Sequence, residues 1–402
     1  MIGPWGRILA LGAVAGTGLA VISGAGDWGT AHQLLAALAL PPLAGLVILA
    51  WVSARTLLPS ATSALILFGI AAGLTGRSVH LTASALAFAA TTWVCVLAFR
   101  GVTLKSLRPG RRPVEADTAR DYLTLTKPRV MSLLLLTGGA AVFVGASGVP
   151  NWGVFAVTMI GLALACGGAG TFNHYLDRDI DQLMGERTAR RPVAAGRITP
   201  VHALEFGIAL SALSFVLLDS IVNLPTALLA LSGNLFYVFV YTRWLKRTTA
   251  QNIVIGGAAG AVPPLVGYAS ASGHLGWGAL VMFGIVFLWT PPHFWALALM
   301  IKEHYANADV PMLPNTHGDR ATARQIVWYT IALVAATLVP VAFGVFGLVY
   351  GVAALLLGGV FAWMAYALWR ETTRPRAVSL FHYSMIYLAL LFVAMALDAV
   401  LV

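Results

Sequence analysis

Long runs of apolar residues, separated by short polar stretches, make up most of the chain. Because an α-helix needs about 20 apolar residues to cross the hydrocarbon core of a membrane, each run predicts one spanning helix. Four runs lie near 8–24, 34–52, 61–76 and 80–99. Nine more lie near 130–148, 153–172, 201–219, 222–241, 253–270, 276–296, 325–345, 346–368 and 380–401. The pattern predicts an all-α polytopic membrane protein with about 13 spans.

A polar break over residues 100–124 separates the first four runs from the other nine. We therefore expect three parts: a four-helix transmembrane unit over 1–100, a basic linker over 101–120, and a nine-helix unit over 121–402.

The composition agrees with a membrane protein, since 59% of the residues are hydrophobic and only 10% are charged. The 25 Lys and Arg exceed the 15 Asp and Glu, which gives a net charge of +10. If the N-terminus is cytoplasmic, all the cations except Arg77 fall on the cytoplasmic side. The excess thus predicts orientation in the plasma membrane of a prokaryotic cell, with the polar loops inside. It does not indicate a nucleic-acid partner, because no basic, aromatic-interleaved surface accompanies it.

An acidic cluster follows the sixth predicted span. Asn173, Asp177 and Asp181 are spaced four residues apart, which places them on one face of a helix while Asp179 points away. Three oxygen donors in a row suit Mg²⁺, which completes its coordination with water and substrate phosphates. The alternative is a solvated helix end with local ion pairs. Acidic side chains this close to the hydrocarbon layer cost free energy and are usually functional, which favours the metal site.

Basic residues accompany the cluster on the same predicted side of the membrane. Arg187, Arg190 and Arg191 follow it closely, Lys246 and Arg247 lie in a later loop, and a second polar loop spans 302–309. Arginine beside a carboxylate-bound metal suits the oxygens of a diphosphate. With an apolar tail held between the helices, the combination predicts prenyl transfer.

Several motifs in order make the resemblance to a known family specific. They are Leu125–Met131, Asn173–Asp181, Arg187–Pro192 with Gly196–Pro200, Lys246–Thr249, Asn252–Gly260 with Pro263 and Pro264, Pro292–Ala298 and Val310–Pro314. On these residues the chain, over about 120–400, resembles the UbiA-type intramembrane prenyltransferases. Among them it is most similar to the protohaem IX farnesyltransferases, also called haem O synthases.

The resemblance implies a Mg²⁺-dependent reaction in which the farnesyl group of farnesyl diphosphate joins a vinyl group of haem b to give haem O, on the route to haem A and the cytochrome oxidase cofactor. It also implies membrane lipid and a haem A synthase as partners. It assigns Asn173, Asp177 and Asp181 to the Mg²⁺–diphosphate, and Arg187, Arg191 and Lys246 to the leaving group. Further substrate contacts would come from Lys127, Arg129, His293, Glu303 and Asp309.

Two of these residues keep alternatives open. His293 is the best candidate to contact the haem, but it could equally be a buried, hydrogen-bonded histidine beside a helix break made by Pro291 and Pro292. In the second loop, relatives often carry Asp before the tyrosine, whereas here His304 precedes Tyr305. Either Glu303 or Asp309 substitutes, or a second metal binds weakly or not at all.

The first hundred residues lie outside the prenyltransferase pattern. His32 and His80 open the second and fourth spans, so both are expected at the outer membrane face. Two imidazoles at equal depth in a four-helix bundle can clasp a haem iron. The surrounding segments resemble half of a haem A synthase, which implies a unit that holds or passes haem. The alternative is that both are polar residues at headgroup level.

Two other functions compete with haem farnesylation. One keeps the chemistry with another acceptor, a quinone or chlorophyll precursor; the Pro292–His293 motif argues against it by resemblance. The other is a haem-transporting membrane protein without chemistry. A transporter would place ionisable residues near the middle of the membrane, whereas here the acids gather in the loops.

Overall fold

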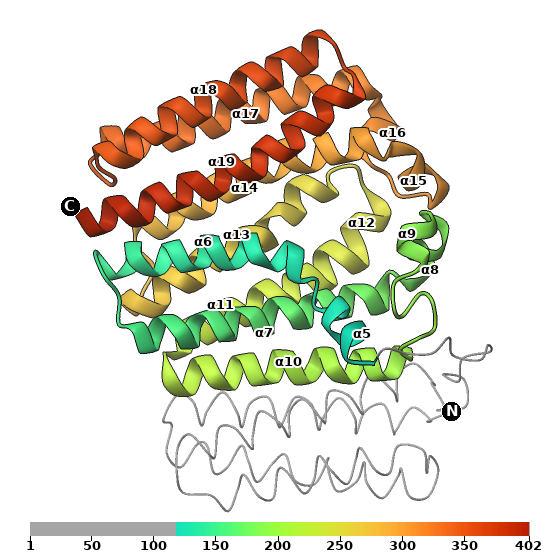
Figure 1. Ribbon diagram of the computed structural model, residues 1–402, viewed down its shortest axis with the longest axis horizontal. Coiled ribbons are helices and arrows are strands. Elements are labelled where there is room, and N and C mark those ends of the chain that lie inside the picture. The colour runs from blue at the N-terminus through green and yellow to red at the C-terminus, as the bar shows by residue number, and fades with distance from the viewer. Residues whose placement is uncertain (1–117, 402) are drawn as a thin grey trace, which may run out of the picture.

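The computed structural model describes residues 118–401, all of whose regular elements are helices (Figure 1). Nine of the helical stretches in this range are long and apolar enough to cross a membrane. They are α6 (Pro128–Ala146), α7 (Trp152–Leu176), α10 (Pro200–Ile221), α11 (Leu224–Leu235) continued by η3 (Phe236–Leu245) and α12 (Lys246–Thr248), α13 (Asn252–Ser272), α14 (Trp277–Met300), α17 (Asp319–Ala342), α18 (Leu348–Arg370) and α19 (Arg374–Leu401). The nine spans predicted beyond residue 121 are thus confirmed. The four predicted earlier spans, His32, His80 and nearly all of the predicted linker lie outside the described residues.

Several helices are longer than the apolar runs that predicted them. Both α17 and α19 begin about six residues early and include the charged residues Asp319, Arg320, Arg374 and Arg376. Long charged side chains can keep their heads in water while their stems cover apolar surface, so a spanning helix extends beyond its apolar run. Helix α14 also continues through Pro291 and Pro292, so the predicted break there is wrong. In membranes, neighbouring helices and hydroxyl side chains can compensate for the backbone bonds that proline removes.

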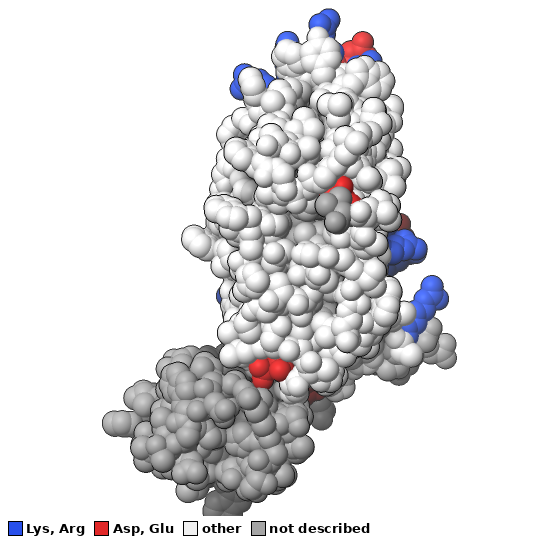
Figure 2. All heavy atoms as spheres, turned by 90° about the vertical axis from the view of Figure 1, so that its left-hand side faces the viewer, with Lys and Arg blue, Asp and Glu red and all other residues white. Residues whose placement is uncertain are grey.

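The long helices lie side by side, and their two ends differ in chemistry (Figure 1). One end carries the short loops 147–151, 222–223, 273–276 and 343–347, in which there is no Asp, Glu, Lys or Arg. Figure 2 views this end: most of its face is white, with a few red acidic patches on it and blue cations at its margin. Asp219 and Asp398 lie near the ends of α10 and α19 that meet here. The asparagines Asn151 and Asn223 cap the helices that follow these loops by accepting backbone N–H bonds. We call it the uncharged end.

The other end gathers the short helices, and we call it the polar end. These are α5 (Thr118–Leu125), α8 (Arg178–Leu183), α9 (Glu186–Ala189), α15 (Lys302–Asn307) and α16 (Leu313–His317) (Figure 1). All loops of the described region that contain Asp, Glu, Lys or Arg lie here. Each Asp, Glu, Lys and Arg on the nine long helices lies within about two turns of a helix end. The hydrocarbon layer of the described bundle therefore meets no charged side chain at its middle.

Helix α6 crosses α13 at very close range because both present glycine at the contact. A Cβ atom on Gly267 would lie 2.0 Å from the carbonyl oxygen of Gly138, and one on Gly145 would lie 2.4 Å from that of Tyr268. Small residues allow such backbone approach in membranes, where packing rather than hydrophobic exclusion holds helices together. The pair α6–α13 therefore depends on these glycines.

This packing predicts that Gly267→Ala destabilises the bundle by about 1–3 kcal/mol, because the new methyl group cannot fit without moving the backbone. The melting temperature of the purified protein in detergent measures the effect. Gly260→Ala is the matched control: it lies on the same helix, and nothing lies within 4 Å of its added Cβ. Its melting temperature should stay the same or rise. Equal melting temperatures for both variants would contradict the packing argument.

Candidate active site

The acidic cluster lies at the polar end, where α7 gives way to α8. Helix α7 ends at Leu176, so Asn173 is helical, Asp177 lies at the junction and Asp181 belongs to α8. The spacing predicts that the three residues share one continuous helix, and this prediction is wrong because the helix is interrupted at Asp177. The backbone nonetheless keeps the four-residue repeat, with N–H···O bonds from Asp177 to Asn173 (2.8 Å) and from Asp181 to Asp177 (2.7 Å).

Burial separates the three aspartates as the spacing predicts. The side chains of Asp177 and Asp181 are 0% and 1% exposed, whereas that of Asp179 is 60% exposed. Asp179 accepts two hydrogen bonds of 2.8 Å from Arg247, and this contact lowers its pKa to about 2. It is an ion pair at the surface, whereas Asp177 and Asp181 face the interior of the site.

Each buried carboxylate is paired with a cation from another part of the chain. Lys246 donates to Asp177 Oδ2 at 2.5 Å, and Arg191 donates to Asp181 Oδ1 at 2.5 Å. Burial raises the pKa of Asp181, and Arg191 opposes that rise. Isolated buried charges would be very costly, so these pairs are what makes the buried carboxylates tolerable.

Asn173 joins the same network through its amide. Its Nδ2 donates to Asp177 Oδ2 (2.8 Å) and to the hydroxyl of Thr242 (3.2 Å). Its Oδ1 accepts from the ammonium of Lys127. The amide therefore links α7, the η3 segment and the start of α6.

Lys127 is held in an unusual backbone conformation. It caps α6 with φ 53° and ψ 56°, in the left-handed region, directly before Pro128. Such a conformation costs about 1–3 kcal/mol for a residue with a side chain, so the surroundings must impose it. Burial, followed by the nearby charge of Arg191, lowers the pKa of Lys127 to about 7. The strained turn places an easily deprotonated lysine on the cluster.

An ion pair with a bifurcated hydrogen bond fixes the turn that brings Lys127 and Arg191 together. Arg197 donates from Nε to both oxygens of Asp121 on α5, at 3.0 Å each, and from Nη2 to the carbonyl of Arg190 at 2.9 Å. The segment before α6 is thereby tied to the loop that carries Arg191.

Two carboxylate oxygens of the cluster have no hydrogen-bond partner. They are Asp177 Oδ1 and Asp181 Oδ2, both fully buried. Arg247 Nη2 lies 3.9 Å from Asp177 Oδ1, too far for a hydrogen bond. Buried acceptors are normally satisfied, so an unpartnered pair calls for an explanation. Within the described residues no three His, Cys, Asp or Glu side chains form a metal-binding group. The two aspartates and the asparagine fit a cation such as Mg²⁺ that takes its other ligands from water and phosphate.

The second polar loop contributes a different residue from those expected. Glu303 and Asp309 are exposed, and in the part of the chain that the structure describes neither side chain makes a hydrogen bond or ion pair. Instead Tyr305 is buried, and burial raises its pKa to about 12 while the charges of Arg191 and Asp177 act on it. His304 packs on Gly185, where an added Cβ would lie 2.7 Å from the imidazole ring. Tyr305 and His304 therefore connect the two loops.

Two predicted basic residues stand apart from the network. Arg187 on α9 and Arg129 on α6 are exposed, and their side chains make no hydrogen bond or ion pair with the described residues. Conversely, the sequence pattern does not single out Thr242, which accepts a hydrogen bond from Asn173, or Tyr305, which lies within the electrostatic influence of Asp177 and Arg191. Thr242 lies four residues before Lys246, a spacing that places both on one helix face and could have indicated it.

His293 lies deeper, on α14, and faces α19. Its Nδ1 lies 2.7 Å from the hydroxyl of Ser384, and its ring stacks on Trp289 and Phe381. His293 is therefore a buried, hydrogen-bonded histidine, as one of the two sequence-based alternatives predicts, but no helix break lies beside it.

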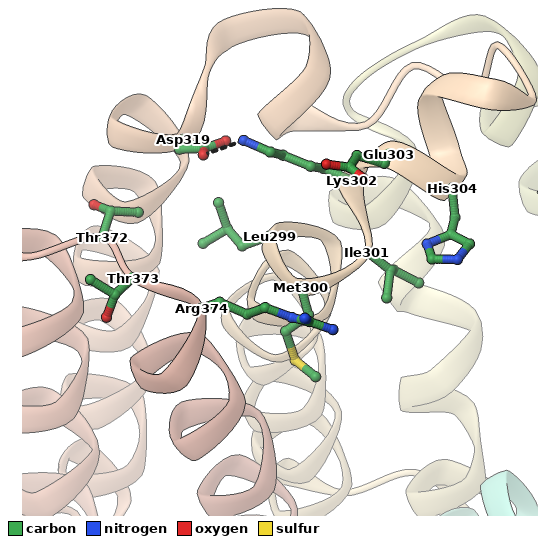
Figure 3. Close-up of a pocket in the computed structure, with 10 residues that line it drawn as sticks. All are labelled: Leu299, Met300, Ile301, Lys302, Glu303, His304, Asp319, Thr372, Thr373 and Arg374. Atoms are coloured by element: carbon green, nitrogen blue, oxygen red, sulfur yellow. Dashed lines mark hydrogen bonds and ion pairs between the residues drawn. The ribbon is translucent and has the colours of Figure 1, made fainter.

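A pocket of about 370 Å³ opens at the polar end, beside α15 (Figure 3). Its wall consists of Leu299–His304, Asp319 and Thr372–Arg374. Lys302 reaches across it to Asp319, with 2.6 Å between Nζ and Oδ2, while Arg374 extends from the opposite wall over Met300 (Figure 3). The pocket lies where α14 ends and α19 begins.

The chain is similar in sequence to known proteins. A protohaem IX farnesyltransferase of Roseiflexus sp. (strain RS-1) is 48% identical over 337 residues, which cover 81% of this chain and 63% of that protein. The chain thus spans less than two thirds of that relative. The match is longer than residues 118–402 can account for, so it includes part of the N-terminal region. A protohaem IX farnesyltransferase of Symbiobacterium thermophilum is 52% identical over 284 residues, covering 70% of this chain and 95% of that protein.

A solved structure shares the fold. The structure of a UbiA homolog from Archaeoglobus fulgidus bound to GPP and Mg²⁺ matches with a TM-score of 0.55 and 16% identity, covering 70% of this chain and all of that one. The model of the UbiA prenyltransferase family matches residues 133–393. On this match and the identity to the Symbiobacterium relative, the chain belongs to the UbiA prenyltransferase family.

Proposed function

We propose that the chain transfers the farnesyl group of farnesyl diphosphate to a vinyl group of haem b, giving haem O, in a Mg²⁺-dependent reaction that serves haem A formation. The observation that carries this proposal is the pair of unpartnered carboxylate oxygens within a ring of cations. The relatives named protohaem IX farnesyltransferase support the choice of both substrates. The family member bound to GPP and Mg²⁺ supports the choice of metal.

The proposed reaction is a substitution at an allylic carbon followed by hydration. The bond between C1 of the farnesyl group and the diphosphate oxygen breaks, and the terminal carbon of the vinyl group forms a bond to C1. Water then adds to the other vinyl carbon and loses a proton, which leaves a hydroxyethylfarnesyl side chain and free diphosphate. The most difficult step is the departure of the diphosphate, because its negative charge grows as the bond breaks.

The polar end of the bundle is suited to that step. Asp177 and Asp181 would hold Mg²⁺ through their free oxygens, with Asn173 beside them, and the ion would supply charge neutralisation at the diphosphate. Lys246, Arg191 and Lys127 are already within the cluster and would donate to the diphosphate oxygens. Arg187 and Arg129, both exposed, would act at its rim, and Glu303 and Asp309 would contact substrate from the second loop.

The same chemistry on another acceptor, a quinone or chlorophyll precursor, uses the same cluster, so only the acceptor distinguishes the two. A transporter without chemistry is less consistent with the described bundle, in which charged side chains avoid the middle of the spans. We also propose that the protein lies in a prokaryotic plasma membrane with the polar end in the cytoplasm, because the cation-rich loops gather there.

For the N-terminal region we propose a haem-holding unit over 1–100 that uses His32 and His80. Its support is the resemblance of the segments around His32 and His80 described above.

The first test is product formation. Membranes containing the protein, incubated with haem b, farnesyl diphosphate and Mg²⁺, should yield haem O by mass spectrometry. Asp177→Asn should lower the rate at least about 100-fold, because the carboxylate acts on the charge that develops during the reaction. Asp179→Asn, a surface aspartate two residues away, is the control and should keep most of the activity. Normal turnover by Asp177→Asn at equal protein level would refute the site, and product only from other acceptors would refute the choice of haem.

A second test measures ligand binding without turnover. Mg²⁺ together with inorganic diphosphate should raise the melting temperature of the purified protein, by an amount that corresponds to about 2.7 kcal/mol at 100 times the dissociation constant. Asp177→Asn should remove this stabilisation and Asp179→Asn should keep it. The same gain in all three proteins would show that the ligands bind elsewhere.

A further inference from the structure

The pocket at the polar end is lined by two charged side chains of opposite sign that have no partner. They are Arg374, at the start of α19, and Glu303, in α15 (Figure 3). Neither side chain makes a hydrogen bond or ion pair with any described residue, so they do not pair with each other either. Opposite charges that line one pocket without meeting leave room between them for a ligand that carries both signs.

Two other charges of the pocket already neutralise each other. Lys302 and Asp319 pair across it, with 2.6 Å between Nζ and Oδ2. The hydroxyls of Thr372 and Thr373 also line it, and they make no hydrogen bond within the described part of the chain. Both threonines lie on the side of the pocket from which Arg374 extends (Figure 3). An anion on this side can therefore accept hydrogen bonds from a guanidinium and from hydroxyl groups.

A ligand with one anionic and one cationic group fits these charges better than a simple ion. An anion alone would leave the carboxylate of Glu303 unpaired, and a cation alone would leave the guanidinium of Arg374 unpaired. A metal ion is not indicated, because the described residues include no group of three His, Cys, Asp or Glu side chains that could hold one, although Glu303, His304 and Asp319 all line the pocket. The cavity volume of about 370 Å³ lies in the range of small-molecule sites, about 300–1,000 Å³.

The pocket lies at the depth of the lipid headgroups. Helix α14 has 24 residues, so it is about 36 Å long and exceeds the hydrocarbon layer of about 30 Å. The pocket is formed where α14 ends and where α17 and α19 begin. Leu299, Met300 and Ile301 add apolar surface to its wall, and all three are only partly buried. A membrane lipid can therefore place its headgroup among the polar groups and the first carbons of its tails against these side chains.

We propose that this pocket binds the headgroup of a membrane phospholipid that carries a primary ammonium beside its phosphate, the phosphoethanolamine class. The phosphate accepts from the guanidinium of Arg374 and from the hydroxyls of Thr372 and Thr373. The ammonium donates to the carboxylate of Glu303. The bound lipid thereby joins the start of α19 to the second polar loop. This site goes beyond the proposed function and does not depend on it.

Lipid binding to the purified full chain tests the choice of headgroup. The protein, stripped of lipid in detergent, is titrated with phosphatidylethanolamine, phosphatidylcholine or phosphatidylglycerol of identical acyl chains, and the bound lipid is measured by native mass spectrometry. We expect the ethanolamine lipid to bind at least about tenfold more tightly than the other two. The trimethylammonium group of choline has no N–H to donate, and the glycerol headgroup has no cation. Equal affinities for the three lipids would overturn the proposal.

A soluble compound distinguishes a lipid site from a site for a free metabolite. Glycerophosphoethanolamine has the same headgroup without acyl chains. It should bind at least about tenfold more weakly than the lipid, because it lacks the apolar contacts. Equal affinity of the soluble compound and the lipid would show that the membrane is not the source of the ligand, and would overturn the proposal.

Variants of the two unpaired charges locate the lipid on the protein. Arg374→Gln should lower the affinity for all three lipids about tenfold, because each loses a charged contact of its phosphate. Glu303→Gln should weaken the ethanolamine lipid alone and so remove its preference. The controls are Arg320→Gln and Asp309→Asn: both residues are exposed and unpaired among the described residues, and neither lines the pocket. They should leave all affinities unchanged.

A preference for the ethanolamine lipid that survives in both Arg374→Gln and Glu303→Gln would overturn the proposal. Both side chains are exposed, so the variants should melt, without added lipid, at the temperature of the unmodified protein. Glu303 is also proposed above to contact substrate, and all these readings are therefore taken without haem and without farnesyl diphosphate. Failure to make haem O with the lipid preference intact would refute the proposed function alone. Normal haem O formation without that preference would refute the lipid site alone.

Discussion

Two carboxylates buried at the membrane boundary need cationic partners, and the segments of the polar end must come together to supply them. Asp177 and Asp181 have almost no access to water, and a buried charge without a partner is far too costly to keep. Their partners come from distant segments: Lys246 at the start of α12 and Arg191 after α9. Lys127 approaches the same cluster through Asn173. The loops between the spans are thus held in place by charge pairing, and the cluster forms only when all of them meet.

The rest of the bundle provides a rigid apolar frame for that cluster. The uncharged end has short loops capped by asparagine side chains, and the α6–α13 contact allows no added carbon atom at Gly267. Because α6 begins directly after Lys127 and α13 begins soon after Lys246, the packing of these two helices also fixes the spacing of the two lysines. Packing in the apolar layer and pairing in the polar layer are therefore coupled.

What could be predicted from the sequence is what depends on positions close together in the chain. The nine spans between residues 121 and 402 follow from their apolar runs, and the burial difference between Asp179 and its neighbours follows from helical spacing. The N-terminal ends of α17 and α19 could not be predicted, because long charged side chains allow a helix to extend beyond its apolar run. The approach of Tyr305, in place of Glu303 or Asp309, depends on how two distant loops meet. The Ser384 contact of His293 spans 91 positions and leaves no local pattern.

The position of Lys127 has a consequence for what the resting protein admits. Its ammonium already occupies the amide oxygen of Asn173, and Lys246 and Arg191 each occupy one carboxylate oxygen. A free divalent cation approaching the cluster meets these positive groups first and is repelled by them. An anion that carries the cation with it is attracted by the same groups and can draw the lysine away from the amide. If the proposed function holds, occupancy of the site would therefore follow the supply of the prenyl donor in the membrane rather than the concentration of metal in the surrounding water.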